Sequence, residues 1–458
     1  MAGIGFELRK ILRRDSYFSL FQAYAYAGLI SSGPWVLSIL GVLLIGFLSV
    51  GTVAPAALVT QFQVSVTYLI AGSLILTGVL QLGFTRYVAD RLFEKDDSRI
   101  LPNLSGALFA VTLAAAVIAL PLLVFGFAGE SLLYRVLMLG SFVVLCNIWM
   151  LAIFLTSVKA YKAVLVLFGV GYGITVCGAW LLSSYGLEGL LTGFFTGHVA
   201  LMAGMMALAL RAYPSNRYVE FDFMQRGRMY RSLMLMGFLY NLGLWADKFI
   251  FWFHPDTSQA IVGPLRASLI YDLPIFLAYL SIIPGMAVFL VRLETDFVEY
   301  YDKFFTAVRD GGTLQHIEAM RNEMVFSARQ GILEIIKIQS ITVLAVFIAG
   351  PSLLKLLGIS PMYLPLLFVD VVAAGLQVVF LGVLNVFFYL DQRRILVQLS
   401  ALFVAGNLIL TLISIGMGAP FYGYGFALSL LIVVITGLLL LDRRLDDLEY
   451  ETFMLQKP

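Results

Sequence analysis

Charged side chains are scarce in this sequence, and their scarcity excludes a soluble protein. Asp, Glu, Lys and Arg make up 13% of the 458 residues, whereas hydrophobic residues make up 60%, and the mean hydropathy is +0.93. A soluble globular domain carries about 25% charged and about 45–50% apolar residues. So much apolar surface has to face lipid, and the short alternating strands of a membrane β-barrel do not dominate the sequence. The composition therefore predicts an all-α polytopic membrane protein.

Residues with catalytic or metal-binding chemistry are also few. The two cysteines, Cys146 and Cys177, lie inside apolar runs, which argues against a disulfide framework or a zinc site. The three histidines, His198, His254 and His316, are too widely separated to indicate a metal site. No P-loop sequence is present, and the net charge of +2 gives no indication of a nucleic-acid partner. We therefore predict no enzyme activity, no catalytic residue, no cofactor and no metal.

Long apolar runs dominate the chain instead. A membrane helix needs about 20 apolar residues, and twelve runs are long enough. The expected spans are residues 21–49, 58–85, 103–128, 132–157, 163–184, 189–210, 232–253, 266–291, 338–357, 362–389, 395–417 and 422–441. Twelve crossings place both termini on the same side of the membrane.

The basic residues support this topology. With both termini in the cytoplasm, 26 of the 30 Lys and Arg residues fall in cytoplasmic segments, as the positive-inside rule requires. Residues 3–16 predict an amphipathic helix, because Ile4, Leu8 and Ile11 share one face and the remainder is largely basic. Such a helix suits an anionic membrane surface, so membrane lipids are expected partners.

The polar connections suggest the domain organisation. The connection 211–231 contains five arginines and divides the chain into two lobes of six spans each. The N-terminal lobe is 1–210, the C-terminal lobe is 232–441, and residues 442–458 form a cytoplasmic tail. Two six-helix lobes are a common transporter plan with the substrate path between them.

The longest polar insertion, 292–337, has two interpretations. Its apolar residues recur at helical spacing on both sides of a break at Gly311–Gly312. One interpretation is a pair of amphipathic helices lying on the membrane surface. The other is a cytoplasmic docking surface for a partner subunit. The sequence alone does not choose between them.

Five ionisable residues in the second lobe fall inside predicted spans. They are Asp247, Lys248, Arg266, Asp272 and Asp370, and the topology places all of them in the outer half of the membrane. Each costs about 2.5–3.5 kcal/mol if it faces lipid at the centre of a span. They must therefore pair with one another, as in Asp247–Arg266 or Lys248–Asp370, or line a hydrated translocation path.

Aromatic and proline residues add to the predicted path. Tyr24 and Tyr26 lie in a polar stretch of the first span, where aromatic rings and hydroxyl groups suit a carbohydrate. Pro34 follows Gly33 in the same span and permits a kink, because proline removes a backbone hydrogen bond. We therefore include Tyr24 and Tyr26 among the expected path residues.

The N-terminal sequence GIGFELRKILRRDSY, followed by AYAYAGLISSGPWVLSILGVLLIG, resembles the Pel exopolysaccharide transporters of the PelG family. The resemblance extends over the whole chain. It implies a MATE/flippase-like fold of the MOP superfamily and a place in the inner membrane of a Gram-negative bacterium. It also implies export of a growing N-acetylhexosamine-rich polysaccharide. The implied partners are a cytosolic glycosyltransferase, a cyclic-di-GMP receptor membrane subunit and a further small membrane subunit.

Two other functions are compatible with the residues. One is a stand-alone proton- or sodium-coupled antiporter of small organic cations, with Asp370 or Asp247 as the coupling carboxylate. The other is a membrane scaffold that assembles other subunits and transports nothing. An antiporter should work in proteoliposomes without other subunits, whereas neutralising Asp247, Asp272 and Asp370 should leave a scaffold intact.

Overall fold

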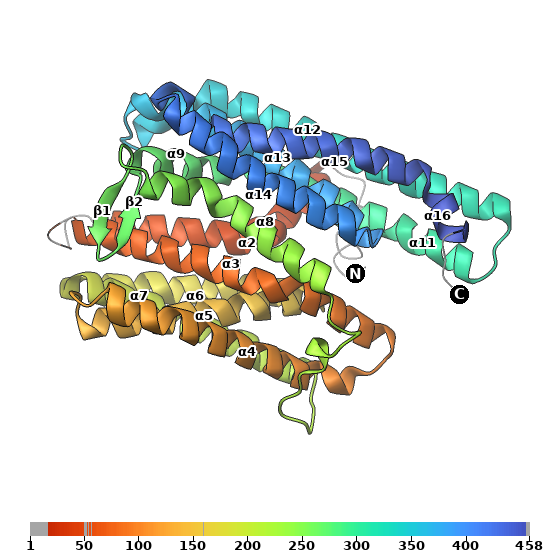
Figure 1. Ribbon diagram of the computed structural model, residues 1–458, viewed down its shortest axis with the longest axis horizontal. Coiled ribbons are helices and arrows are strands. Elements are labelled where there is room, and N and C mark those ends of the chain that lie inside the picture. The colour runs from red at the N-terminus through yellow and green to blue at the C-terminus, as the bar shows by residue number, and fades with distance from the viewer. Residues whose placement is uncertain (1–16, 50–52, 54, 56, 159, 455–458) are drawn as a thin grey trace. The chain divides into compact units, whose positions relative to one another are not determined.

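The computed structural model describes residues 17–49, 53, 55, 57–158 and 160–454. The predicted amphipathic helix 3–16 lies outside the described residues. The described chain is helical apart from connecting loops and one short hairpin of two strands (Figure 1). The apolar segments form long helices. A helix pairs its backbone N–H and C=O groups within itself, so these groups need no hydrogen bonds to water.

The chain divides into two compact units. The central unit is Gly33–Leu269, and the C-terminal unit combines Met1–Ser32 with Ile270–Pro458. The first half of the chain contains α2 (Tyr17–Ser49), α3 (Ala57–Phe93), η1 (Asp97–Arg99), α4 (Ile100–Pro121), the π-helical turn η2 (Leu122–Gly126), α5 (Leu132–Ser157), α6 (Tyr161–Leu181), α7 (Gly186–Ala212) and α8 (Arg231–Phe253). The second half contains α9 (Leu269–Tyr279), α10 (Ile283–Val291), the π-helical turn η6 (Arg292–Phe297), α11 (Val298–Arg309), α12 (Leu314–Leu356), α13 (Leu364–Tyr389), α14 (Arg393–Gly416), α15 (Tyr424–Asp446) and α16 (Leu448–Met454).

Helices occupy all twelve predicted spans. Among the described residues, ten helices are long and apolar enough to cross a membrane, and the two halves of α2 together make an eleventh. The helix α2 bends between Gly33 and Val36, where the Gly33–Pro34 pair predicted a kink. The remaining predicted span coincides with α8, which carries Asp247 and Lys248 and is not among the ten.

The two units are divided differently from the two predicted lobes. The first half of α2 packs within the C-terminal unit, where a Cβ atom at Gly28 would contact Ile283 at 3.4 Å. The helix α8 packs within the central unit against α3. Their backbones approach so closely that a Cβ atom at Gly237 would lie 2.3 Å from the Gly78 carbonyl oxygen. Glycine pairs of this kind permit close helix contact in membranes.

The predicted start of the eighth span at Arg266 is wrong. Residues Gln259–Val262 (β1) and Leu265–Ala267 (β2) form an antiparallel hairpin, and α9 begins only at Leu269. The hairpin turns at Gly263, whose φ of 51° favours glycine. Side chains of α3 hold the hairpin, because Gln61 and Tyr68 donate hydrogen bonds to backbone carbonyl groups of the two strands.

The insertion 292–337 continues the membrane helices instead of forming a separate element. The segment α10–η6–α11 runs without interruption into the polar region, and α12 returns from it as one helix of 43 residues (Figure 1). At 1.5 Å per residue α12 is about 65 Å long, twice the roughly 30 Å of a bilayer core. The pair α11–α12 therefore extends well beyond the membrane. The chain reverses at Gly311–Gly312, as predicted, with Gly311 at a φ of 69°.

Candidate functional site

Asp247 and Lys248 are buried next to each other on α8. Their side chains are 0% and 1% exposed. The Lys248 Nζ atom lies 3.0 Å from Asp247 Oδ2 and donates a further hydrogen bond of 3.0 Å to the Leu244 carbonyl oxygen. The ammonium group thus folds back along its own helix to meet the neighbouring carboxylate. This arrangement offsets part of the cost of holding two charges in an apolar surrounding.

Arg266 does not pair with Asp247. It lies on β2, where its Nε atom donates a hydrogen bond to the Ser258 hydroxyl group. Its carbonyl oxygen accepts a hydrogen bond of 2.8 Å from the Tyr68 hydroxyl group. The predicted Asp247–Arg266 pair is therefore wrong, because the hairpin directs the guanidinium group towards its own loop. The proposed pairing of Lys248 with Asp370 stays a prediction.

The remaining predicted residues belong to the C-terminal unit. Asp370 lies on α13 and is completely buried. Its Oδ1 atom faces Gly423, which precedes α15 as its N-cap residue with a φ of 82°. A Cβ atom at Gly423 would lie only 2.9 Å from this oxygen. Asp272, in the first turn of α9, and Tyr26, on α2, are half-buried. The predicted path residues are thus divided between the units, with Asp247, Lys248 and Arg266 in the central one.

The sequence does not predict a second, partly buried polar cluster, which lies in the C-terminal unit at η6. We call it the π-turn cluster; it consists of Tyr24, Arg292, Glu294, Asp296, Glu334, Asn385 and Tyr389. The Arg292 guanidinium group forms ion pairs with Glu334 at 2.5 Å and with Asp296 at 2.9 Å. The predicted path residue Tyr24 interacts with the same guanidinium group.

Glu294 is held separately in the same cluster. Asn385 donates a hydrogen bond of 2.6 Å to one carboxylate oxygen, and Tyr389 donates one of 3.0 Å to the other. Both donors come from α13. A π-helical turn widens the helix and is frequent at functional sites, and here it presents Arg292 and Glu294 to different neighbours. The sequence signal for this cluster is the run of charged residues directly after an apolar span, at the start of the insertion 292–337.

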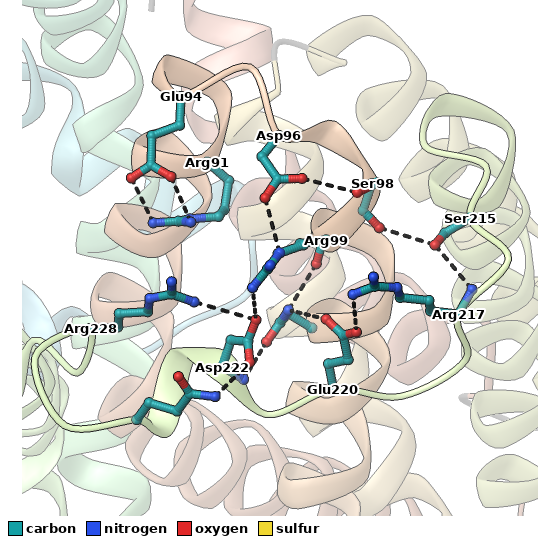
Figure 2. A network of polar contacts seen from close by, with 12 residues as sticks. Arg91, Glu94, Asp96, Ser98, Arg99, Ser215, Arg217, Glu220, Asp222 and Arg228 are labelled. Carbon is teal, nitrogen blue, oxygen red and sulfur yellow. Dashed lines mark hydrogen bonds and ion pairs between the residues drawn. The ribbon is translucent and has the colours of Figure 1, made fainter.

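The basic connection 211–231 is tightly attached to the start of α4. Asn103 accepts a hydrogen bond of 2.7 Å from the Asp222 backbone amide and donates one of 2.9 Å to the Arg99 carbonyl oxygen. Asp222 lies between Arg99 and Arg228, at 3.0 and 3.4 Å from their guanidinium groups (Figure 2). We call this arrangement the linker clamp. It leaves no room for a side chain at Gly106, where a Cβ atom would lie 2.0 Å from the Glu220 carbonyl oxygen.

Tyr230 lies near the end of the same connection and precedes α8 as its N-cap residue. Burial raises the pKa of Tyr230, and its hydrogen bond to the Asp90 carboxylate raises it further. The hydroxyl group therefore stays protonated and continues to donate at physiological pH. This contact attaches the start of α8 to the end of α3.

His198 acts as a hydrogen-bonding residue between helices. It is 2% exposed. Its Nδ1 atom lies 2.8 Å from the Phe194 carbonyl oxygen, and its Nε2 atom lies 3.3 Å from the Tyr172 hydroxyl group. Tyr172 in turn donates a hydrogen bond of 2.7 Å to Ser38. Throughout the described residues, no group of three or more His, Cys, Asp or Glu side chains could hold a metal ion.

The fold is that of a known class of membrane transporter. An outward-facing multidrug resistance MATE family transporter of the MOP superfamily matches with a TM-score of 0.66 and 14% identity, over 93% of this chain and 97% of that chain. MATE in the bent conformation matches with a TM-score of 0.63 and 14% identity, over 98% and 99% of the two chains. A MOP superfamily transporter from Pyrococcus furiosus matches with a TM-score of 0.61 and 13% identity, over 93% and 96%. The protein is a polytopic membrane protein with a MATE-like transporter fold.

A comparison of the sequence with protein-family models identifies the family of this chain. The family model described as "PelG: Putative exopolysaccharide Exporter (EPS-E)" matches residues 1–453. The chain therefore belongs to the PelG family, which confirms the resemblance of its N-terminal motif. No curated protein sequence matches the chain.

Proposed function

We propose that this protein is the inner-membrane subunit that translocates a growing, N-acetylhexosamine-rich Pel polysaccharide from the cytoplasm to the periplasm. The observation that carries this proposal is the match of the exporter family over residues 1–453, together with a transporter fold. Both termini are cytoplasmic in this proposal, because 26 of the 30 Lys and Arg residues then lie in cytoplasmic segments. The protein supplies the path, and elongation of the polymer supplies the driving force.

The extension α11–α12 is the proposed docking element for the cytosolic glycosyltransferase. It reaches well beyond the length of a membrane span, and Arg329 anchors it to Asp442 and Asp446 of α15 at 2.6 and 2.9 Å. Phe326 is 64% exposed on this extension. An exposed aromatic residue on a braced helix is a suitable anchor for a protein partner. A cyclic-di-GMP receptor subunit and a small membrane subunit complete the proposed complex.

Reconstitution tests the export function. Proteoliposomes that contain this chain and the glycosyltransferase, supplied with nucleotide sugar outside, should accumulate polymer that is protected from added glycosidase. Vesicles with either protein alone should not. If protected polymer still forms when this chain is omitted, the proposed function is wrong. If Asp247→Asn and Asp370→Asn both leave the protected fraction unchanged, those residues do not line the path.

The docking element can be tested with two matched variants. Phe326→Asp should abolish co-purification of the glycosyltransferase, because it removes an apolar contact and adds a charge. Asn322→Asp adds the same charge to an exposed position of the same helix and should leave co-purification intact. Equal co-purification of both variants would exclude Phe326 from the interface.

A stand-alone antiporter of organic cations is the second candidate. The complete burial of Asp370 favours it, because an intramembrane carboxylate can bind a proton or a cation. This function requires uptake of an organic cation, driven by a pH or sodium gradient, in proteoliposomes that contain no other subunit. Uptake by wild type that Asp370→Asn abolishes would favour the antiporter over the exporter.

A further inference from the structure

The end of the connection 211–231 borders a cavity of about 530 Å³ that none of the functions above uses. Its lining residues are Met224, Arg226, Gly227, Met229 and Arg231. All of them belong to the central unit, and Arg231 is the first residue of α8. The cavity thus lies where the polar connection meets a membrane helix, which the proposed topology places at the cytoplasmic membrane surface.

The two arginines of this cavity differ from Arg217 and Arg228, which are paired within the connection. Arg228 pairs with Asp222 at 3.4 Å, and Arg217 pairs with Glu220 at 2.8 Å. In the part of the chain that the structure describes, the guanidinium groups of Arg226 and Arg231 form no hydrogen bond and no ion pair; both side chains are exposed. The connection therefore neutralises some of its arginines internally and leaves two at one cavity.

The chemistry of the cavity selects an anion. Two guanidinium groups at one cavity repel each other, and an anion bound between them would lower this electrostatic repulsion. The planar guanidinium group matches the oxygens of a phosphate, with two parallel hydrogen bonds. The first turn of α8 contains no acidic residue that would compete for the arginines.

The apolar part of the cavity indicates which kind of anion fits it. Met224 and Met229 line it beside the arginines, and Met224 is 40% exposed. Methionine adapts to irregular apolar ligands. A phosphate next to an apolar segment is the chemistry of a lipid headgroup, and basic pockets at cytoplasmic helix ends suit such groups.

We propose that the cavity at Arg226 and Arg231 binds the phosphate headgroup of an anionic membrane lipid. Gly227, with a φ of 97°, forms the turn between the two arginines, a backbone conformation that other residues rarely adopt. The bound lipid would hold the connection 211–231 at the membrane surface. The site does not depend on which substrate the transporter exports, so it can fail or hold independently of the export function.

Titration of the purified full-length protein in neutral detergent tests this site. The probes are short-chain phosphatidylglycerol, the matching phosphatidylcholine and inorganic phosphate, and the readouts are bound lipid by native mass spectrometry and the thermal unfolding midpoint. Phosphatidylglycerol should bind and raise the midpoint. The double variant R226Q/R231Q should weaken this binding by at least about tenfold, because charge-assisted hydrogen bonds are lost.

Arg211→Gln is the matched control. Arg211 lies at the end of α7, is exposed, and has no ion pair among the described contacts, but it does not line the cavity. The variant removes one positive charge from the same connection, as R226Q and R231Q each do, and should bind phosphatidylglycerol as wild type does, whereas R226Q and R231Q should each weaken binding. Equal losses in R211Q and in the single cavity variants would mean general charge attraction and would overturn the site.

Three further outcomes decide the proposal. If inorganic phosphate binds as tightly as phosphatidylglycerol, the occupant is a free phosphate and the lipid assignment is wrong. If phosphatidylcholine binds equally well, the arginines do not select an anionic lipid, and the proposal is also wrong. Should R226Q/R231Q fail to fold, R226K/R231K keeps both charges but not the planar fork. This variant should bind phosphatidylglycerol more weakly than wild type, and unchanged binding would overturn the proposal.

Discussion

In the central unit Lys248 folds back along α8 to meet Asp247, whereas in the C-terminal unit Glu294 is held by Asn385 and Tyr389 from a different helix. The first contact joins neighbouring residues of a single helix. The second exists only when η6 and α13 are packed together. Asp247 and Lys248 therefore meet along one helix, whereas Glu294 depends on contacts between helices, and mutations should show different effects at the two places.

The largest effect is expected at the local pair. Asp247→Asn leaves the Lys248 ammonium group buried without the neighbouring carboxylate and should destabilise the protein by about 3–5 kcal/mol, as for other broken buried ion pairs. The double variant Asp247→Asn/Lys248→Gln removes both charges and should recover most of this loss. Thermal unfolding of the purified proteins measures both. Additive losses in the double variant would contradict a direct interaction between the two side chains.

Close helix packing is expected to have the next largest effect. Gly237→Ala forces a Cβ atom to within 2.3 Å of the Gly78 carbonyl oxygen and should cost about 1–3 kcal/mol. Gly375→Ala is the matched change in the C-terminal unit, where the nearest atoms, in Gln339 and Val343, lie at ordinary contact distances of 3.6 and 3.8 Å. It should be neutral or stabilising, because alanine favours the helix. Equal unfolding midpoints for both variants would contradict the close contact of α3 and α8.

The linker clamp should respond to Asn103. Asn103→Ala removes the acceptor for the Asp222 and Phe223 amide groups at a buried position and should cost about 1–3 kcal/mol. Limited proteolysis should then cut the connection 211–231 faster than in wild type. Ser215→Ala removes only exposed hydrogen bonds of the same connection and serves as the control. Unchanged proteolysis of Asn103→Ala would mean that other contacts hold the connection.

The smallest stability effect is expected at the π-turn cluster. Glu294→Gln keeps a carbonyl oxygen that can still accept a hydrogen bond, so it should change stability by about 1 kcal/mol or less. Glu294→Ala leaves Asn385 and Tyr389 without their acceptor and should cost more. Measuring both polymer export and thermal unfolding of the Glu294→Gln variant distinguishes a transport role of the carboxylate from a structural one. Loss of export in a stable Glu294→Gln variant would make Glu294 part of the transport mechanism, whereas normal export would make it structural.

The positions of the membrane helices were predictable from the sequence, because an apolar run of about 20 residues depends on local composition alone. All twelve predicted spans coincide with helices. The start of the eighth did not, since Arg266 follows a turn at Gly263 and lies in a hairpin that α3 holds in place. A hydropathy pattern contains no information about contacts between segments so far apart in the chain.

The candidate site was predictable only in part. The sequence predicted five ionisable residues inside the spans, because charges inside apolar runs are conspicuous, and three of them, Asp247, Lys248 and Asp370, are buried. It did not reveal the π-turn cluster, since Glu294 and its partner Asn385 are 91 positions apart. It also did not reveal which arginines of the connection 211–231 are neutralised.

The sequence by itself determined that this protein spans the membrane, which segments are helical and which family it belongs to. All three depend on composition and on contiguous motifs. The tertiary structure decided which side chains meet. Whether an arginine of the connection pairs with Asp222, as Arg228 does, or lines the cavity, as Arg226 does, depends on how the connection folds against α4 and α8. Scarce charge indicated a membrane protein, and the packing of the helices determined what those few charges contact.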